Sequence, residues 1–190
     1  MKLGLFGGSF DPVHLGHLLV AQAAREELDL DRLFFIPAAQ SPFKPDNAAA
    51  PGPDRSRLLR LALAGKAWCE IDEQELHRGG VSYTIDTLRD YARRYPSAQI
   101  FYLIGADHAA KLPAWRDAQE LARLAEFVVV PRPGQSEMPF PKPFRGHVLK
   151  GFPLGVSSSQ VRARIKAGQP IDHLVSAAVA EAVRNSALYR

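Results

Sequence analysis

Short, mostly apolar runs that alternate with segments of helical periodicity constrain the fold of this chain more than any other feature. Each run is too short for a helix and is bounded by turn-forming residues, which is typical of buried strands. The expected strands are residues 3–6, 33–36, 68–71, 100–104, 127–130 and 147–149. The expected helices are residues 15–28, 54–64, 84–95, 107–112, 116–124, 158–167 and 171–185. This alternation predicts a Rossmann-like α/β fold, in which helices cover both faces of a doubly wound, mainly parallel sheet.

Length and composition favour one domain that spans residues 1–190, because 190 residues that are 46% hydrophobic can bury one sizeable core. The net charge of +4 is mild and its basic residues are scattered, which favours small anionic ligands over nucleic acid. The single cysteine, Cys69, excludes an internal disulfide. No run reaches the ~18 to 20 apolar residues of a membrane span, and the chain starts directly with a strand. A cytoplasmic location without a membrane partner is therefore expected.

Residues 7–17, Gly-Gly-Ser-Phe-Asp-Pro-Val-His-Leu-Gly-His, join the first expected strand to the first expected helix. Gly7 and Gly8 lack Cβ atoms, so the backbone there can take positive φ and approach a bulky anion. His14 and His17 fall on one side of the first helical turn, beside unpaired N–H groups and the positive end of the helix dipole. This arrangement predicts a phosphate site in which two imidazoles stabilise charge on phosphate oxygens.

A protein-held metal is the alternative interpretation of the same segment, because Asp11, His14 and His17 follow one another at intervals of three residues. Asp11 precedes Pro12, however, and the residue before a proline is biased towards an extended conformation. We therefore expect Asp11 to lie off the face of the two histidines and no metal to be held by the protein.

A second motif near the C-terminus, Val-Ser-Ser-Ser-Gln-Val-Arg at residues 156–162, combines a serine-rich helix start with a permanent cation. Together the two motifs, about 140 residues apart, resemble the signatures of the nucleotidylyltransferase superfamily. Those signatures are a glycine turn followed by H-x-G-H, and I-S-S-T-x-I-R. The resemblance implies that ATP binds through the backbone around Gly7, Gly8, Ser9 and Phe10, and that His14, His17 and Arg162 are catalytic. It also implies ATP contacts from Ser157, Ser158, Gly105 and Asp107.

Two further segments are similar to elements of bacterial nicotinate-nucleotide adenylyltransferases. They are Val-Ser-Tyr-Thr-Ile-Asp-Thr-Leu at residues 81–88 and Leu-Pro-Ala-Trp-Arg at residues 112–116, which look like S-Y-T-x-x-T-L and L-P-x-W. In that family the acceptor is nicotinate mononucleotide, so the resemblance implies that Trp115 stacks on a pyridine ring. The amides of Tyr83 and Thr84 are then expected to bind the ring carboxylate.

Two proline-rich segments, residues 38–53 and 131–145, follow expected strands and are expected to form the rim of the active site. The first departs from the P-N-x-x-P-P-H-K pattern of the family, because Ala38, Ala39 and Phe43 stand where other residues are usual. Lys44 keeps the basic position and, with Arg132 of the second segment, is an expected acceptor-binding residue.

The expected reaction is transfer of AMP from ATP to nicotinate mononucleotide, with Mg²⁺ held mainly by phosphates and water. One alternative is a sister transferase that acts on nicotinamide mononucleotide, phosphopantetheine or a cytidylyl acceptor. Another is a regulatory protein that binds nucleotide without turnover. The sequence leaves the oligomeric state open.

Overall fold

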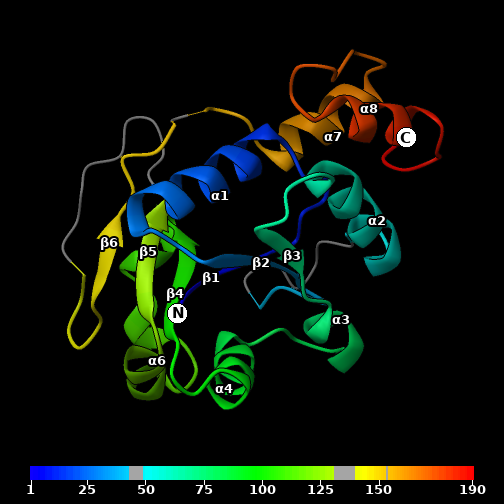
Figure 1. The fold of residues 1–190 in the computed structure, drawn as a ribbon. Coiled ribbons are helices and arrows are strands. Elements are labelled where there is room, and N and C mark those ends of the chain that lie inside the picture. Colours follow the sequence, from blue (N-terminus) through cyan, green and yellow to red (C-terminus); the bar gives the residue numbers. More distant parts are fainter. Residues whose placement is uncertain (43–48, 131–139, 153) are drawn as a thin grey trace.

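Six parallel strands form the sheet at the centre of the computed structural model, which describes residues 1–42, 49–130, 140–152 and 154–190 (Figure 1). The strands are β1 (Lys2–Gly8), β2 (Arg32–Pro37), β3 (Cys69–Ile71), β4 (Gln99–Gly105), β5 (Glu126–Val130) and β6 (Gly146–Val148). Their spatial order is β3-β2-β1-β4-β5-β6, and every pairing between them is parallel. The predicted doubly wound sheet is confirmed. The strand order changes direction between β1 and β4, which is where open α/β sheets bind ligands.

Helices cover both faces of the sheet, as expected (Figure 1). One face packs against α1 (Leu15–Leu28), α2 (Gly52–Leu63), α7 (Ser158–Lys166) and α8 (Ala177–Arg184). The other packs against α4 (Thr84–Arg94) and α6 (Ala118–Leu124). Alternation along β2 separates the two cores, because Phe35 faces the α1 side while Phe34 and Ile36 face the α4 side.

Short helical turns complete the chain: α3 (Gln74–Arg78), α5 (Ala106–Ala109) and the 3₁₀ turn η1 (Leu112–Ala114). Helix α3 was not expected, because five residues are too few to show a helical period. The helix expected at residues 107–112 is divided between α5 and η1. The helix expected from residue 116 begins at Ala118, because Asp117 adopts a left-handed conformation at φ 54°.

The last helix is shorter than expected. Its periodicity predicted residues 171–185, whereas α8 spans Ala177–Arg184 and a separate turn begins at Ile171. That turn presents the carbonyl of Leu174 to the backbone N–H of Leu15, at 2.9 Å. The first N–H of α1, expected to be unpaired, is therefore bonded within the protein.

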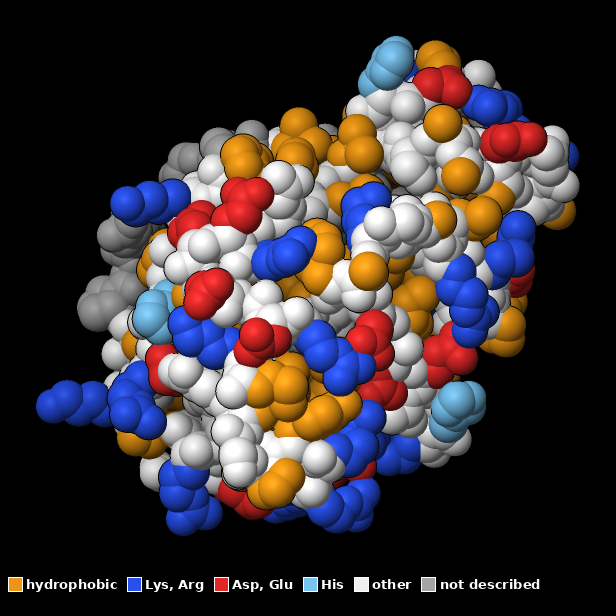
Figure 2. All heavy atoms as spheres, in the orientation of Figure 1, with side chains coloured by type: hydrophobic (Ala, Val, Ile, Leu, Met, Phe, Trp, Pro, Cys, Tyr) orange, Lys and Arg blue, Asp and Glu red, His pale blue; other side chains and the backbone are white. Residues whose placement is uncertain are grey.

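No helix among the described residues is long and apolar enough to cross a membrane. In the view of Figure 2, Lys and Arg side chains are spread over the face and interspersed with Asp and Glu. The positive charge of the chain is thus not gathered into one stripe on this face.

Candidate active site

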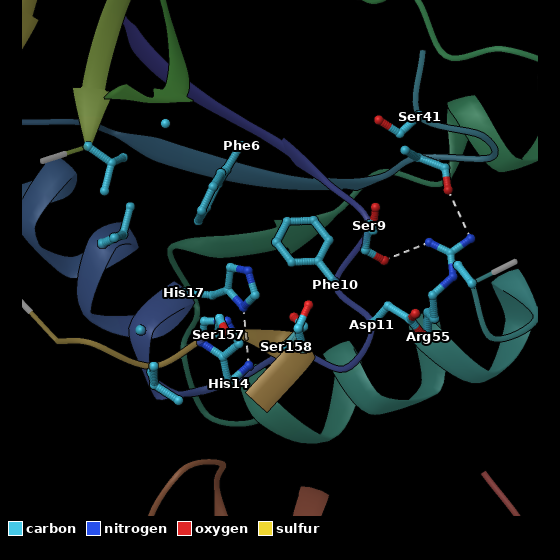
Figure 3. Close-up of a pocket in the computed structure, with 18 of the residues that line it drawn as sticks. Phe6, Ser9, Phe10, Asp11, His14, His17, Ser41, Arg55, Ser157 and Ser158 are labelled. Atoms are coloured by element: carbon cyan, nitrogen blue, oxygen red, sulfur yellow. Dashed lines mark hydrogen bonds between the residues drawn. The ribbon is translucent and has the colours of Figure 1, made fainter. Parts of the chain in front are cut away.

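A cavity of about 1220 Å³ opens at the carboxyl ends of the strands, beside the starts of α1, α2 and α7 (Figure 3). Ser9, Gly105 and Val130, which end or directly follow β1, β4 and β5, lie in its wall. The first expected rim segment also lines it, through residues 38–41 and 49–52. The described part of the second rim segment, residues 140–145, does not line the cavity. Its Phe144 is buried in the core on the α4 side.

His14 and His17 stack on each other in this cavity, with ring centroids 3.7 Å apart and ring planes inclined by 25° (Figure 3). The expected placement of both imidazoles on one side of the first turn is confirmed. Nδ1 of His17 accepts a hydrogen bond from the backbone N–H of His14 at 3.1 Å. This bond fixes the tautomer, so that the proton of the neutral His17 ring is on Nε2.

Both imidazoles are neutral near pH 7 in this structure. Desolvation by burial lowers the pKa of His14 to about 4. Burial, and secondarily the neighbouring His14, lowers the pKa of His17 well below its ordinary value. The pair therefore meets a ligand as N–H dipoles and not as two fixed cations.

Gly16 allows this stacking. A Cβ atom on Gly16 would lie 3.0 Å from Nδ1 of His14 and 3.1 Å from a methyl group of Val156. Those contacts are tighter than ordinary packing permits, so a side chain here would displace the His14 ring. The glycine between the two histidines is thus explained by the space that the His14 ring occupies.

The two glycines at the end of β1 have a different role from the expected one. Neither Gly7 nor Gly8 has positive φ, and neither lines the cavity. A Cβ atom on Gly7 would overlap the hydroxyl of Tyr102, and one on Gly8 would lie 3.1 Å from the ring of Phe10. The left-handed residue of this turn is Phe10 itself, at φ 47°. The expectation of positive φ at the glycines is therefore wrong.

Phe10 packs against His17, one member of the histidine pair. Its ring is 1% exposed and makes an edge contact with His17 at a centroid distance of 5.0 Å. Phe6 and Phe35 pack on the same ring. The side chain of Phe10 thus belongs to the core, and it also lines the cavity beside Ser9.

The second motif is hydrogen-bonded to the first. Ser157 caps α7, with its hydroxyl accepting from the backbone N–H of Gln160. The hydroxyl of Ser158 donates to the carbonyl of Pro12 at 2.9 Å, and Arg162 donates to the carbonyl of Asp11 at 2.7 Å. Ser157, Ser158 and Arg162 all line the cavity, so the structure brings both motifs to one place.

The carboxylate of Asp11 is occupied by protein groups. It is buried, accepts from the backbone N–H of Ala50 at 3.1 Å, and lies 3.6 Å from Arg162. Within the described residues no group of three or more His, Cys, Asp or Glu side chains is arranged to hold a metal ion. The arrangement gives the Asp11, His14 and His17 alternative no support.

Arg55 is a site residue that the sequence reasoning missed. Its guanidinium is 2% exposed and donates to the carbonyls of Ser9 at 2.7 Å, Ala38 at 2.9 Å and Ala50 at 2.8 Å (Figure 3). Three cavity segments are thereby tied to α2. The sequence did contain one sign that Arg55 is buried: it shares its helix face with Leu58, Leu59 and Ala62. Helix α2 begins at Gly52, two residues before the expected start at residue 54, so Asp54 lies within its first turn.

The residues expected around the nucleoside are not all in the wall. Gly105 lines the cavity, whereas Asp107 lies exposed on α5 and is not among the lining residues. The lysine and arginine expected to bind the acceptor, Lys44 and Arg132, lie outside the described residues.

A second, smaller cavity of about 140 Å³ brings together Tyr83, Thr84 and Trp115, as the motifs predicted. Tyr83 and Thr84 stand at the start of α4, and Trp115 follows η1 and packs its edge on Phe127. Pro42 lines this slot while its neighbour Ser41 lines the large cavity. The two cavities therefore meet at one loop.

The fold and the site together define a class of nucleotide-transferring proteins. In this class a histidine pair lies at the switch point of a parallel sheet and is held by a serine and arginine motif that is distant in sequence. The sequence profile described as cytidylyltransferase-like matches residues 5–164, and the chain belongs to this family of nucleotidyltransferases. A probable nicotinate-nucleotide adenylyltransferase of Opitutus terrae is 40% identical over 193 residues, which cover 100% of this chain and 98% of the relative. Another protein of that name, from Bacillus licheniformis, is 41% identical over 190 residues, which cover 99% of this chain and 98% of that relative. The predicted branch of the superfamily is confirmed.

The three-dimensional fold is also similar to that of a solved structure. The solved nicotinic acid mononucleotide adenylyltransferase of Plasmodium falciparum, complexed with NaAD, superposes with a TM-score of 0.80 at 16% identity. The match covers 99% of this chain and 97% of that one. At this identity the likeness concerns the fold.

Proposed function

We propose that this protein transfers AMP from ATP to nicotinate mononucleotide, which gives deamido-NAD and pyrophosphate. The observation that carries the proposal is the meeting of two cavities of suitable size at residues 41 and 42. The large cavity suits a nucleoside triphosphate, and the slot suits one aromatic ring. Full-length relatives named for this activity support the same conclusion.

In the large cavity, His14 and His17 are proposed to donate hydrogen bonds to the phosphates of ATP. Neutral donors held by stacking and by the His14 backbone are already oriented before the ligand arrives. Such preorganised dipoles stabilise the charge that develops in a transition state without having to reorient. Arg162, Ser157 and Ser158 are proposed to face the same phosphates from α7, and Ser9 and Gly105 to line the rest of the nucleotide site.

In the slot, the ring of the acceptor is proposed to lie against Trp115, with its carboxylate at the start of α4. The first backbone N–H groups of a helix lack partners within the helix, so Thr84 is placed to donate to an anion. Lys44 and Arg132 remain predicted partners of the acceptor phosphate.

The chemistry needs no protein nucleophile. A phosphate oxygen of the mononucleotide attacks the α-phosphorus of ATP, a new P–O–P linkage forms, and the bond to the β-phosphate breaks to release pyrophosphate. The attacking phosphate is already ionised at neutral pH, so no general base has to remove a proton. Positioning and charge stabilisation then supply the rate enhancement.

Magnesium is proposed to enter as part of the substrate, as MgATP. The carboxylate that lies in the cavity, Asp11, is bound to Ala50 and Arg162, which fits a metal carried by phosphates and water better than one held by the protein. We expect chelation by EDTA to abolish turnover and added Mg²⁺ to restore it.

Pyrophosphate release from ATP with a panel of acceptors tests the proposal. Nicotinate mononucleotide should give the largest kcat/KM, and nicotinamide mononucleotide, phosphopantetheine and a cytidylyl acceptor with CTP should give less. A larger value for another acceptor would assign the protein to a sister activity. ATP binding without release for any acceptor would instead support a regulatory protein.

A further inference from the structure

The slot proposed for the acceptor ring has a charged residue at its wall, Arg116, to which the motif resemblance assigned no role. Arg116 follows Trp115 directly, and its guanidinium lies 4.8 Å from the centroid of the Tyr83 ring. At this distance the positive charge is attracted by the face of the ring. Tyr83 thus holds the guanidinium beside the slot.

The remaining wall is uncharged. The other described residues that line the slot are Pro42, Tyr83, Thr84, Ile85, Ala114, Trp115 and Leu121. Arg116 is therefore the only charged residue among the described residues that line the slot, and its charge is positive. A guanidinium fork also matches the geometry of a carboxylate.

Neighbouring acidic groups are engaged elsewhere. Arg89, on the outer side of α4, lies 3.0 Å from Asp117 and 3.8 Å from Asp86, and it also pairs with Glu120. Within the described part of the chain, the structure has no ion pair that joins any of these carboxylates to Arg116. The charge of Arg116 is thus left to an anionic group that enters the slot.

We infer that Arg116 is a specificity-determining residue, whose guanidinium pairs with the carboxylate on the acceptor ring and so selects acid-bearing over amide-bearing rings. The inference rests on the proposed function and adds a side chain to the backbone amides of Tyr83 and Thr84. A ring amide has no charge for Arg116 to pair with, so the residue contributes selectivity more than general affinity.

Kinetics with two acceptors test the inference. In Arg116→Gln, kcat/KM for nicotinate mononucleotide should fall on the order of 10-fold, since a partly exposed charge pair is lost. The value for nicotinamide mononucleotide should change by less than about 2-fold, and KM for ATP should not change. Arg116→Lys should retain an intermediate preference, because it keeps the charge but not the planar fork. Arg93→Gln on the far end of α4, where the side chain is 80% exposed, is the matched control.

A binding measurement separates this inference from the proposed function. The chain has two tryptophans, so Trp68→Phe leaves Trp115 as the fluorescent reporter of the slot. In that background, nicotinate mononucleotide should quench Trp115 at lower concentration than nicotinamide mononucleotide, and Arg116→Gln should reduce this difference on the order of 10-fold. Equal losses for both ligands, or no loss, would overturn the role of Arg116. Quenching that follows the expected pattern without any turnover would overturn the proposed function and leave the role of Arg116 standing.

Discussion

Arg162 donates a hydrogen bond to the backbone carbonyl of Asp11 at 2.7 Å, across 151 positions of sequence. Ser158 makes the neighbouring bond to Pro12. The histidine motif and the serine motif are therefore one hydrogen-bonded unit, and neither can be positioned without the other. This contact explains why the two signatures occur together in one chain.

Replacing either histidine by alanine should lower turnover by a factor on the order of 10² to 10³, because each removes an oriented donor from the proposed phosphate site. His17→Ala and His14→Ala should be compared at saturating ATP by pyrophosphate release. His173→Ala, at an exposed position between α7 and α8, is the control and should retain full activity. If either cavity variant kept more than half of the wild-type turnover, the proposed phosphate contacts would be incorrect.

The free energy of unfolding should decrease as the pH is lowered from 7 to 5. His14 has a pKa of about 4 in the folded protein and about 6.5 in the unfolded chain, so the unfolded state takes up the proton first. Over this interval His14 alone should cost about 2 kcal/mol of stability, and His17 acts in the same direction.

Urea unfolding of the wild type and of His14→Phe at both pH values isolates this contribution. Burial raises the pKa of Glu75, which has the opposite effect on stability, but that contribution is shared by both proteins and cancels in the comparison. The decrease should be smaller in the variant by about 2 kcal/mol. An identical pH dependence would show that His14 is not desolvated.

Arg55→Ala should destabilise the fold by about 3 kcal/mol or more, since it leaves the carbonyls of Ser9, Ala38 and Ala50 without their buried donor. Arg57 lies on the same helix with its side chain 46% exposed, and Arg57→Ala should cost less than about 1 kcal/mol. Thermal and urea unfolding of the two variants measure the difference. Similar losses would contradict the role of Arg55 as a link between three cavity segments.

Gly7→Ala should destabilise the protein by about 1 to 3 kcal/mol, because the added methyl group overlaps the Tyr102 hydroxyl. Tyr102→Phe removes that hydroxyl, so the double variant should regain part of the loss. A double-mutant cycle on urea unfolding gives the coupling energy. Strictly additive effects would mean that Gly7 is required for another reason, such as contact with a ligand.

The strands and α1 were predictable because their signal is local. Each expected strand was found within two residues of its predicted ends, since apolar runs and turn residues mark buried strands directly. The structure near the C-terminus was harder to predict from the sequence. Ile171 and Val175 are buried at helical spacing, yet they belong to the turn that bonds Leu15, and periodicity cannot distinguish such a turn from a helix.

In the site too, local sequence predicts the residues of a motif but not the contacts that explain single residues. His14, His17, Ser157 and Arg162 were identified from their motifs and lie together. The reason for Gly7 is the hydroxyl of Tyr102, which is 95 positions later in the chain and cannot be recognised from local sequence. The role inferred for Arg116 could not be predicted from sequence, because it depends on the ring of Tyr83 and on the acids that pair with Arg89.

The bonds from α7 to the histidine loop also have a consequence for biosynthesis. A ribosome completes His14 and His17 early, but the residues that hold their loop emerge only when most of the polypeptide has been made. A nascent chain therefore carries the histidines without an assembled cavity, and the proposed binding of ATP has to await folding of the C-terminal segment. Nucleotide binding by this protein is in that sense a late event of its own synthesis.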